Sequence, residues 1–386
     1  MDAVVRKIAG AVRGVVGSGP FGLHEPDIGK HEEGYVLDCL RSGYVSSVGE
    51  HVVGFEDLLA GLLGSRYSIA VVSGTAALHL GLLGLGVRES DEVLVPSMTF
   101  VASVNAIAYC GATPHFVDVE DEVFGVSPEK LDDYLASICD YDGLTCTNRN
   151  TGSRISALVV VHLLGFPARI KELCLIAKKY GLRVLEDAAG AIGSRVNGQH
   201  VGTFGDIGIL SFNGNKTITT GGGGAVFTSD EEFAGKIRDL ATTWRIPHPF
   251  EVKHGGIAFN YRMPNMNAAL GLAQLARLDE FLDKQSRLHS VYQTAFSGIE
   301  GITMVEGLID SLPNHWLQAA LLSELDKNLM DELLNELARF GLQARLAWSP
   351  IHAMKAYDSS PRAELSVTAR VAQTLICLPS SPQIVA

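Results

Sequence analysis

The sequence has 386 residues, more than one compact core usually holds and enough for two domains. Hydrophobic residues make up 47% and charged residues 19%, a balance typical of globular enzymes and unlike that of disordered or fibrous chains. The formal net charge of -12 argues against a broad nucleic-acid-binding surface. No apolar run approaches the length of a membrane span, so we expect no membrane association.

Residues 1–24 form an N-terminal arm that does not look like a cleavable signal peptide. Arg6, Lys7 and Arg13 interrupt its apolar stretch, so we expect a frayed or amphipathic segment. The six cysteines are scattered without a CxxC pair, and no second pair of ligands follows Cys139 and Cys146 at metal-binding spacing. We therefore expect no metal site and interpret the cysteines as reduced thiols, which suits the cytoplasm.

From about residue 67 the chain alternates short β-branched runs with helical patterns. The segments that contain the expected strands are YSIAVVSG, DEVLVPS, TPHFVDV, ISALVVVHLLG, LRVLEDAAG, GDIGILSF and GGAVFTS. Strands that alternate with helices imply right-handed βαβ crossovers and a mainly parallel sheet covered on both faces.

The pattern changes to α+β from about residue 290. NHWLQAALLS predicts a strand, MDELLNELARFG a helix that ends at Gly341, and LQARLAW a further strand. We therefore divide the chain into the arm at residues 1–24, a large α/β domain at residues 25–285 and a small α+β domain at residues 286–386.

Ligands of α/β sheets gather at the carboxyl ends of strands, and three candidate sites lie there. The first is the turn of Ser73, Gly74 and Thr75, where glycine permits close backbone approach and the helix N-terminus offers N–H groups to an anion. The same residues also fit an ordinary helix cap. The turn alone therefore does not distinguish a phosphate site from a capped helix.

The second candidate is the acidic pair Glu186 and Asp187, which ends a strand that we expect to be buried. Buried carboxylates are costly unless they are paired. An Asp facing a pyridinium nitrogen would form a charge-assisted hydrogen bond with it. A helix cap or a metal-binding acid would explain the pair equally well.

The third candidate is Lys216, which follows the strand GDIGILSF by a short turn. Desolvation at such a place lowers the pKa of an amine and makes it a nucleophile toward an aldehyde. Taken alone, the segment also fits a surface lysine in a hairpin. The glycine run 221–224 lacks the strand–GxxxxGK–helix context of a triphosphate site, and predicts a tight turn that gives Lys216 room.

Seven segments together are more specific than any one site. They are VVSGTAALHLGLLGLG, DEVLVPSMTF, GATPHFVDVE, VVHLLGFPA, LEDAAGAIGS, VGTFGDIGILSFNGNK and NYRMPNMNAALGLAQL, in this order. In this series the chain resembles the sugar aminotransferases of the DegT/DnrJ/StrS family, from about HEPDIGK to LPSS. The resemblance implies pyridoxal phosphate (PLP) as cofactor. It also implies the PLP-dependent transferase fold type I, with a mainly parallel seven-stranded sheet between helices and a smaller C-terminal α+β domain.

The resemblance implies a role for each matching residue. Lys216 would form the Schiff base with the cofactor and move the proton, and Asp187 would pair with the pyridine nitrogen. The residues that would hold the cofactor phosphate are Gly74, Thr75 and Ser211. Phe100 would stack on the ring, and Asn260 would reach the phosphate from the second subunit of a homodimer with shared active sites. Without the resemblance, Phe100 fits a core residue and Asn260 a loop cap.

One position departs from the family pattern. Gly190 follows the two alanines where the family usually has Gln or His, a side chain that normally lies near the cofactor's 3-hydroxyl. We expect this contact to be missing or to come from elsewhere. His162 matches a family histidine, and a buried structural role explains it at least as well as a catalytic one.

Four segments narrow the resemblance: SGYVSSVGEHVVGFE, DYDGLTCTNRNTGSRISA, NGNKTITTGGGG and ARLAWSPIH…LPSS. They are similar to aminotransferases of the legionaminic-acid and bacillosamine type. This implies transfer from L-glutamate to C4 of a nucleotide-linked 4-keto-6-deoxy sugar, with UDP-4-keto-6-deoxy-N-acetylglucosamine favoured, for a bacterial surface glycan or nonulosonic acid. The expected substrate contacts are Tyr44, Ser46, Ser47, His162, Arg345, Trp348 and His352. A core Trp and a solvated Arg explain the segment around Trp348 equally well.

Four other functions are compatible with parts of this pattern. A 3-keto nucleotide-sugar aminotransferase differs only in small features of the pocket and stays open. A dehydratase of the same fold would carry histidine in place of Lys216, and a non-catalytic regulatory protein would be expected to lose Lys216 or Asp187. A nucleotide-dependent dehydrogenase would need a glycine fingerprint followed by a ribose-binding acid, which the sequence lacks.

Overall fold

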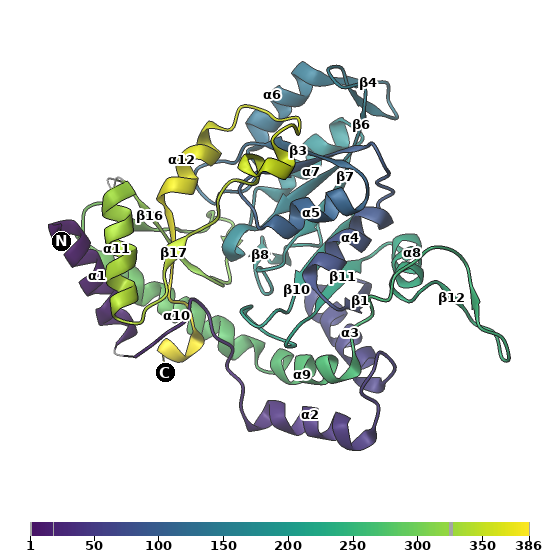
Figure 1. The fold of residues 1–386 in the computed structure, drawn as a ribbon, viewed down its shortest axis with the longest axis horizontal. Helices are drawn as coiled ribbons and strands as arrows, with labels where there is room; N and C mark the ends of the chain where they lie inside the picture. The colour runs from purple at the N-terminus through teal and green to yellow at the C-terminus, as the bar shows by residue number, and fades with distance from the viewer. Residues whose placement is uncertain (1, 18, 324–326, 386) are drawn as a thin grey trace.

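The computed structural model describes residues 2–17, 19–323 and 327–385. These residues form a large unit around one sheet and a small unit around another, joined by long helices (Figure 1). In the view of Figure 1 the small unit lies on the left, and both ends of the chain lie with it.

The large sheet runs in the order β1, β11, β10, β7, β6, β2, β3. In that order the strands span Tyr67–Val71, Gly224–Thr228, Ile207–Ser211, Arg183–Asp187, Arg154–Val161, Glu92–Pro96 and Thr113–Val117. Neighbours from β10 to β3 are parallel, and β11 is antiparallel to both β1 and β10. The prediction of a mainly parallel sheet is confirmed. A hairpin of β4 (Cys139–Tyr141) and β5 (Cys146–Asn148) is added at β6.

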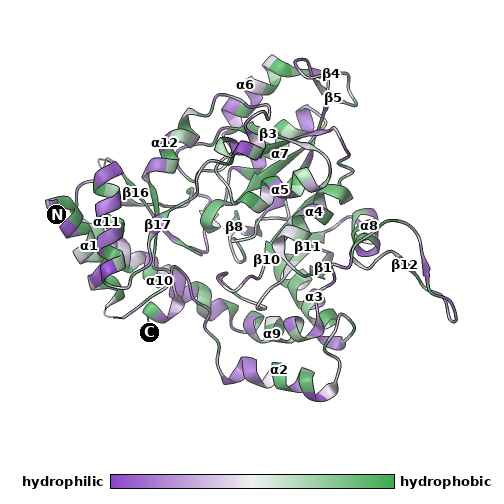
Figure 2. Cartoon of the chain, viewed as in Figure 1, coloured by the Kyte–Doolittle hydropathy of each residue, from purple (hydrophilic) through white to green (hydrophobic). Residues whose placement is uncertain are grey.

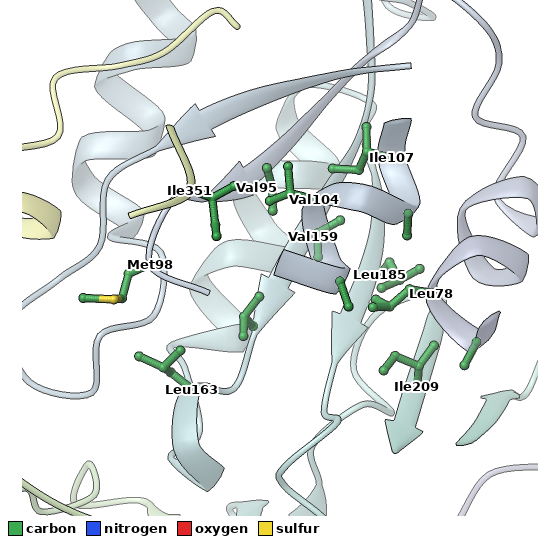
Figure 3. Close-up of a cluster of buried hydrophobic side chains, with 14 of the residues drawn as sticks. Leu78, Val95, Met98, Val104, Ile107, Val159, Leu163, Leu185, Ile209 and Ile351 are labelled. Carbon is green, nitrogen blue, oxygen red and sulfur yellow. The ribbon is translucent and has the colours of Figure 1, made fainter. Parts of the chain in front are cut away.

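Helices cover both faces of this sheet, which explains why its strands are apolar almost without interruption. The helices are α3 (Glu50–Leu63), α4 (Gly74–Gly84), α5 (Val101–Tyr109), α6 (Pro128–Ile138), α7 (Ile170–Lys179), α8 (Glu231–Ala241) and α9 (Asn265–Leu275), and α2 (Lys30–Ser42) packs on the outside of α9. On one face, Val159 and Leu185 from the strands meet Leu78 from α4 and Val104 from α5 (Figure 3). The alternate residues of the strands pack in a second cluster with α3, α6, α7 and α9.

The small sheet is antiparallel, in the order β14, β16, β18, β17. Its strands are Ile302–Met304, Gln318–Leu322, Leu375–Leu378 and Arg345–Leu346 in that order, and α12 spans Ser366–Thr374. Helices α1 (Ala3–Val16), α10 (Leu278–Phe296) and α11 (Lys327–Arg339) share its hydrophobic cluster. Much of α11 is hydrophilic where it faces the viewer in Figure 2. None of the helices in the described ranges is long and apolar enough to cross a membrane.

The N-terminal arm is amphipathic rather than frayed, because the apolar side chains of α1 pack in the small unit's cluster with α10 and α11. The expected division between residues 285 and 286 falls within α10, so the domain limits remain a proposal. Beyond α1, residues 21–25 run beside the small sheet, where Phe21 forms a β-bridge with Leu342. The arm is therefore part of a packed unit.

The remaining elements are short. Strands β15 (Ser311–Leu312), β8 (Arg195–Val196) and β9 (Gln199–His200) form one small sheet, and β12 (Arg245–Ile246) pairs with β13 (Lys253–His254) in a hairpin that projects at the right of Figure 1. The single-turn helices are η1 (Leu163–Gly165), η2 (Ile351–Ala353), η3 (Lys355–Tyr357) and η4 (Pro382–Ile384).

The expectation that all six cysteines are reduced is corrected by the structure. Cys139 and Cys146 form a disulfide with a Cα–Cα distance of 5.9 Å. The sequence did not indicate this pair, because pairing of β4 with β5 is what brings the two residues together. Free thiols remain at Cys39, Cys110, Cys174 and Cys377.

Candidate active site

A cavity of about 290 Å³ lies at the carboxyl ends of the parallel strands. Residues that end or follow β2, β6, β7 and β10 line it, together with the start of α4. The small unit contributes Trp316, Arg345 and Trp348. This is the edge of an α/β sheet where ligands bind, here closed by a second unit.

Lys216 lies in the cavity lining, in the turn that follows β10. Its backbone N–H donates to the carbonyl of Asn213 at 3.0 Å, and its Nζ lies 3.5 Å from the centroid of the Trp316 ring. Burial lowers the pKa of the Lys216 amine from 10.5 to about 7; Asp187 acts to raise it and Arg345 to lower it. The amine can therefore take up and release a proton near neutral pH.

Asp187 ends β7 and is only 5% exposed. Its Oδ2 accepts a hydrogen bond from the Ser103 hydroxyl at 2.6 Å, and its Oδ1 accepts one from the Ala189 N–H at 3.1 Å. Thr99 Oγ1 lies 2.9 Å from the same Ser103 hydroxyl. Neutral donors thus orient the carboxylate, and its charge is left to act on a ligand in the cavity.

The start of α4 lies tightly against the ends of β10 and β11. A Cβ added at Gly74 would lie 2.8 Å from the Cβ of Ser211, and one at Gly224 would lie 2.6 Å from the carbonyl carbon of Ser73. These close approaches require glycine, and they place the N-terminus of α4 beside Ser211. Thr75 also lines the cavity, so this corner suits a phosphate group.

An aromatic and cationic wall lines the side toward the small unit. Phe100 is 56% exposed, and its ring centroid lies 6.3 Å from that of Trp348. The Arg345 guanidinium carbon lies 5.8 Å from the centroid of the Trp348 ring. These three side chains can cover a planar ligand and attract an anionic one.

His162 also lines the cavity, but both nitrogens of its ring have partners in the protein. The Ala168 N–H donates to Nδ1 at 3.1 Å, so Nε2 carries the proton and donates to Glu186 Oε2 at 3.0 Å. Glu186 also accepts from the backbone N–H groups of residues 202, 204 and 205. The pair therefore links the turn after β6 to the end of β7 and to residues 202–205, and a contact of His162 with substrate stays a proposal.

Five other predicted site residues do not line this cavity in the single chain. Tyr44, Ser46 and Ser47 lie in the exposed loop between α2 and α3, and Asn260 lies in an exposed segment beside Thr242. His352 is held by Ser97, whose Oγ lies 2.7 Å from its Nδ1 and accepts from its backbone N–H at 3.1 Å. Their roles toward substrate or cofactor remain proposals.

The sequence did not indicate two of the lining residues, Ser103 and Trp316. Ser103 looks like any small helical residue, and Trp316 like a core residue of a strand. The related position in the sequence is Gly190, the departure from the family pattern: in the structure a Cβ there would lie 2.3 Å from Trp316 Cε3. The Trp316 ring thus fills the space that a larger residue at position 190 would need.

The residues in the cavity fit pyridoxal phosphate. The buried Asp187 carboxylate suits the ring nitrogen, the α4 N-terminus beside Ser211 suits the phosphate, and the Lys216 amine suits the aldehyde. Together with the sheet order, this donor set defines the class of the protein as a PLP-dependent transferase of fold type I.

Comparison with known proteins gives the family. The model of the DegT/DnrJ/EryC1/StrS aminotransferase family matches residues 26–386, and the chain belongs to this family. It is therefore a PLP-dependent aminotransferase, and its relatives include sugar aminotransferases.

Three relatives show how similar the chain is to known proteins. The chain is 36% identical over 336 residues to GDP-perosamine synthase of Escherichia coli O157:H7, covering 87% of this chain and 86% of that protein. Identity to GDP-perosamine synthase of Caulobacter vibrioides is 34% over 336 residues, covering 86% and 85%. The crystal structure of DesI in the presence of its TDP-sugar product has a TM-score of 0.81 and 30% identity, covering 94% of this chain and 88% of that one.

Proposed function

We propose that this aminotransferase moves the amino group of L-glutamate to C4 of a nucleotide-linked 4-keto-6-deoxy sugar. The observation that carries the proposal is that one cavity holds both the Lys216 amine, with its pKa near 7, and the buried Asp187 carboxylate. The arginine and aromatic side chains at the wall toward the small unit fit an anionic, ring-shaped substrate.

Each residue has a defined task in this proposal. PLP, when bound, supplies an electron sink for the negative charge that develops on carbon during amino transfer. Lys216 Nζ accepts and returns the proton, for which a pKa near the working pH is best. Asp187, oriented by Ser103, keeps its charge directed at the ring position. Phe100 and Trp348 reduce the access of water.

Two observations support a nucleotide-linked sugar as the substrate. Relatives that are 36% and 34% identical are named for a GDP-linked product, and a structural relative was solved with a TDP-linked product. The resemblance to the legionaminic-acid and bacillosamine branch favours UDP-4-keto-6-deoxy-N-acetylglucosamine, which we propose as the substrate. The GDP-linked 4-keto-6-deoxy sugar is the second candidate because of the first of these identities. Nucleotide sugars are cytoplasmic metabolites, so we propose that the reaction takes place in the cytoplasm.

The test is amino transfer from nitrogen-labelled L-glutamate. The protein is incubated with PLP and, separately, with the UDP-linked 4-keto sugar, the GDP-linked 4-keto sugar and a 3-keto nucleotide sugar. Mass spectrometry detects the labelled amino sugar and NMR gives the carbon that carries the nitrogen. We expect labelled product at C4 of the UDP-linked sugar, none with Lys216→Ala, and full activity with the matched control Lys355→Ala, an exposed lysine.

Product from the GDP-linked sugar alone would move the proposal to the second candidate. Product from the 3-keto sugar alone would contradict transfer to C4. Undiminished turnover by Lys216→Ala would contradict the role given to that amine.

A further inference from the structure

Trp316 belongs to the small unit and contacts the turn that carries Lys216. It precedes β16 and is only 3% exposed. Its indole N–H donates to the carbonyl of Asn215 at 2.6 Å, and its ring centroid lies 3.5 Å from Lys216 Nζ. One side chain thus contacts both the reactive amine and the peptide group next to it.

Asn314 and Gly190 hold Trp316 in place. Its backbone N–H donates to Asn314 Oδ1 at 2.9 Å, and Asn314 Nδ2 donates to the carbonyl of Gly190 at 2.9 Å and to that of Ile192 at 2.8 Å. A Cβ at Gly190 would lie 2.3 Å from Trp316 Cε3. The loop that follows Asp187 therefore fixes where the ring lies.

We propose that Trp316 is a positioning residue for the Lys216 amine: its indole face holds Nζ, and its N–H holds the turn at Asn215 from which Lys216 extends. The inference rests on the proposed function, which makes Lys216 the reactive amine. It goes beyond that function because it gives a role to Trp316. Because Trp316 precedes β16 in the small unit and Lys216 follows β10 in the large one, the position of the Lys216 amine also depends on how the two units pack against each other.

An aromatic face and an aliphatic side chain act differently on an amine. The face of an indole attracts an ammonium group, and the attraction is stronger where water is excluded. Leucine at position 316 would still exclude water but would offer no such attraction, so the charged form of Lys216 would be less stable. Phenylalanine would keep an aromatic face and lose only the N–H donor. A residue that merely fills space would make no such distinction.

The experiment measures the pKa of Lys216 in cofactor-free protein, from the pH dependence of trace acetylation followed by mass spectrometry. We expect Trp316→Leu to lower the pKa by about half a unit to one unit, and Trp316→Phe to keep it within about a few tenths of a unit of wild type. Trp244→Leu is the matched control, because Trp244 does not line the cavity, and should leave the pKa unchanged. Circular dichroism and urea denaturation check that each variant is folded.

A second measurement covers the case in which Trp316→Leu does not fold. Tryptophan emission of the wild type should titrate near pH 7 as Lys216 changes charge, and this titration should be lost in both Trp316→Phe and Lys216→Met. An equal or higher pKa in folded Trp316→Leu, or no such titration, would overturn the inference. Neither measurement needs cofactor or sugar, so a failure of the proposed function would appear separately, as absent amino transfer with the pKa shift intact.

Discussion

Two neighbouring charges act in opposite directions on Lys216. Burial is the largest cause of its lowered pKa, Asp187 raises the pKa, and Arg345 lowers it. A lysine reacts as the neutral amine, which predominates above its pKa. The reactivity of Lys216 should therefore rise through about pH 7 and level off above it.

Removing either charge should shift this midpoint in a known direction. Asp187→Asn removes the group that raises the pKa and should move the midpoint below that of wild type; Arg345→Gln should move it above. The measurement is the rate at which PLP develops its visible absorbance band with cofactor-free protein as a function of pH. Arg339→Gln, an exposed arginine paired with Glu336, serves as the control. A wild-type midpoint near 10.5, the ordinary lysine value, would contradict the account.

Loss of the hydrogen bond from Ser103 to Asp187 should slow the two half-reactions less than loss of the Asp187 charge. Ser103→Ala removes one donor at 2.6 Å, and we expect the rates of both half-reactions to fall about tenfold. Asp187→Asn removes the charge and should lower them by at least about a hundredfold. Rapid-mixing absorbance with glutamate, and then with the keto sugar, gives the two rates. Ser137→Ala on the exposed side of α6 is the control, and equal effects of the two cavity variants would contradict this ranking.

At the level of elements, the strands of the large sheet could be predicted because each is a buried apolar run between turn signals. β6 and β7 are examples, and their pairing is parallel as expected. The pairs β12–β13 and β8–β9 could not be predicted, because two-residue strands carry no periodic pattern and depend on contacts made elsewhere. The packing of α1 on α10 joins segments more than 250 residues apart in the chain, which no local pattern indicates.

The candidate site, like the fold, could be predicted in part. Residues at strand ends, such as Lys216, Asp187 and Ser211, line the cavity because the topology of a parallel sheet brings them together. The roles of Ser103 and Trp316 could not be predicted, because their contacts arise only when α5 and the small unit pack against that edge. Proximity along the chain also misled: Trp348 lines the cavity, whereas His352, four residues later, does not.

The contact between the loop at Gly190 and Trp316 gives a test at the level of elements. Gly190→Ala should destabilise the fold by about 1–3 kcal/mol, because the new Cβ would lie 2.3 Å from Trp316 Cε3. In a double-mutant cycle with Trp316→Leu, the two losses should be less than additive by at least about 0.5 kcal/mol. Urea denaturation of cofactor-free protein gives the values. Gly235→Ala, where a Cβ meets nothing within 4 Å, is the control and should not destabilise α8. Additive losses would contradict the contact.

At the level of the whole molecule, large apolar side chains are exposed at several places, two of which lie close to predicted site residues. Tyr44 and Val48 are 63% and 65% exposed in the loop before α3, and Phe250 and Ile257 are 94% and 92% exposed around the β12–β13 hairpin. Such surfaces favour association with another chain. We propose a homodimer in which this hairpin brings Asn260 toward the phosphate of the second active site.

Subunit complementation tests this dimer. Lys216→Ala and Asn260→Asp should each be inactive alone, the second because a carboxylate would repel the cofactor phosphate. If Lys216 and Asn260 of one site come from different chains, refolding the two variants together should restore about a quarter of wild-type sites. Light scattering should give twice the mass of one chain. No gain in activity on mixing, with dimers present, would show that both residues serve the same subunit's site.

We expect this chain to carry out both halves of an amino transfer. The most direct measurement is the visible absorbance of the PLP-loaded protein, recorded before and after L-glutamate and then after UDP-4-keto-6-deoxy-N-acetylglucosamine. We expect a visible band that glutamate removes and the keto sugar restores, and that is absent from Lys216→Ala. A protein that develops no band with added PLP, or a band that glutamate leaves unchanged, would contradict it.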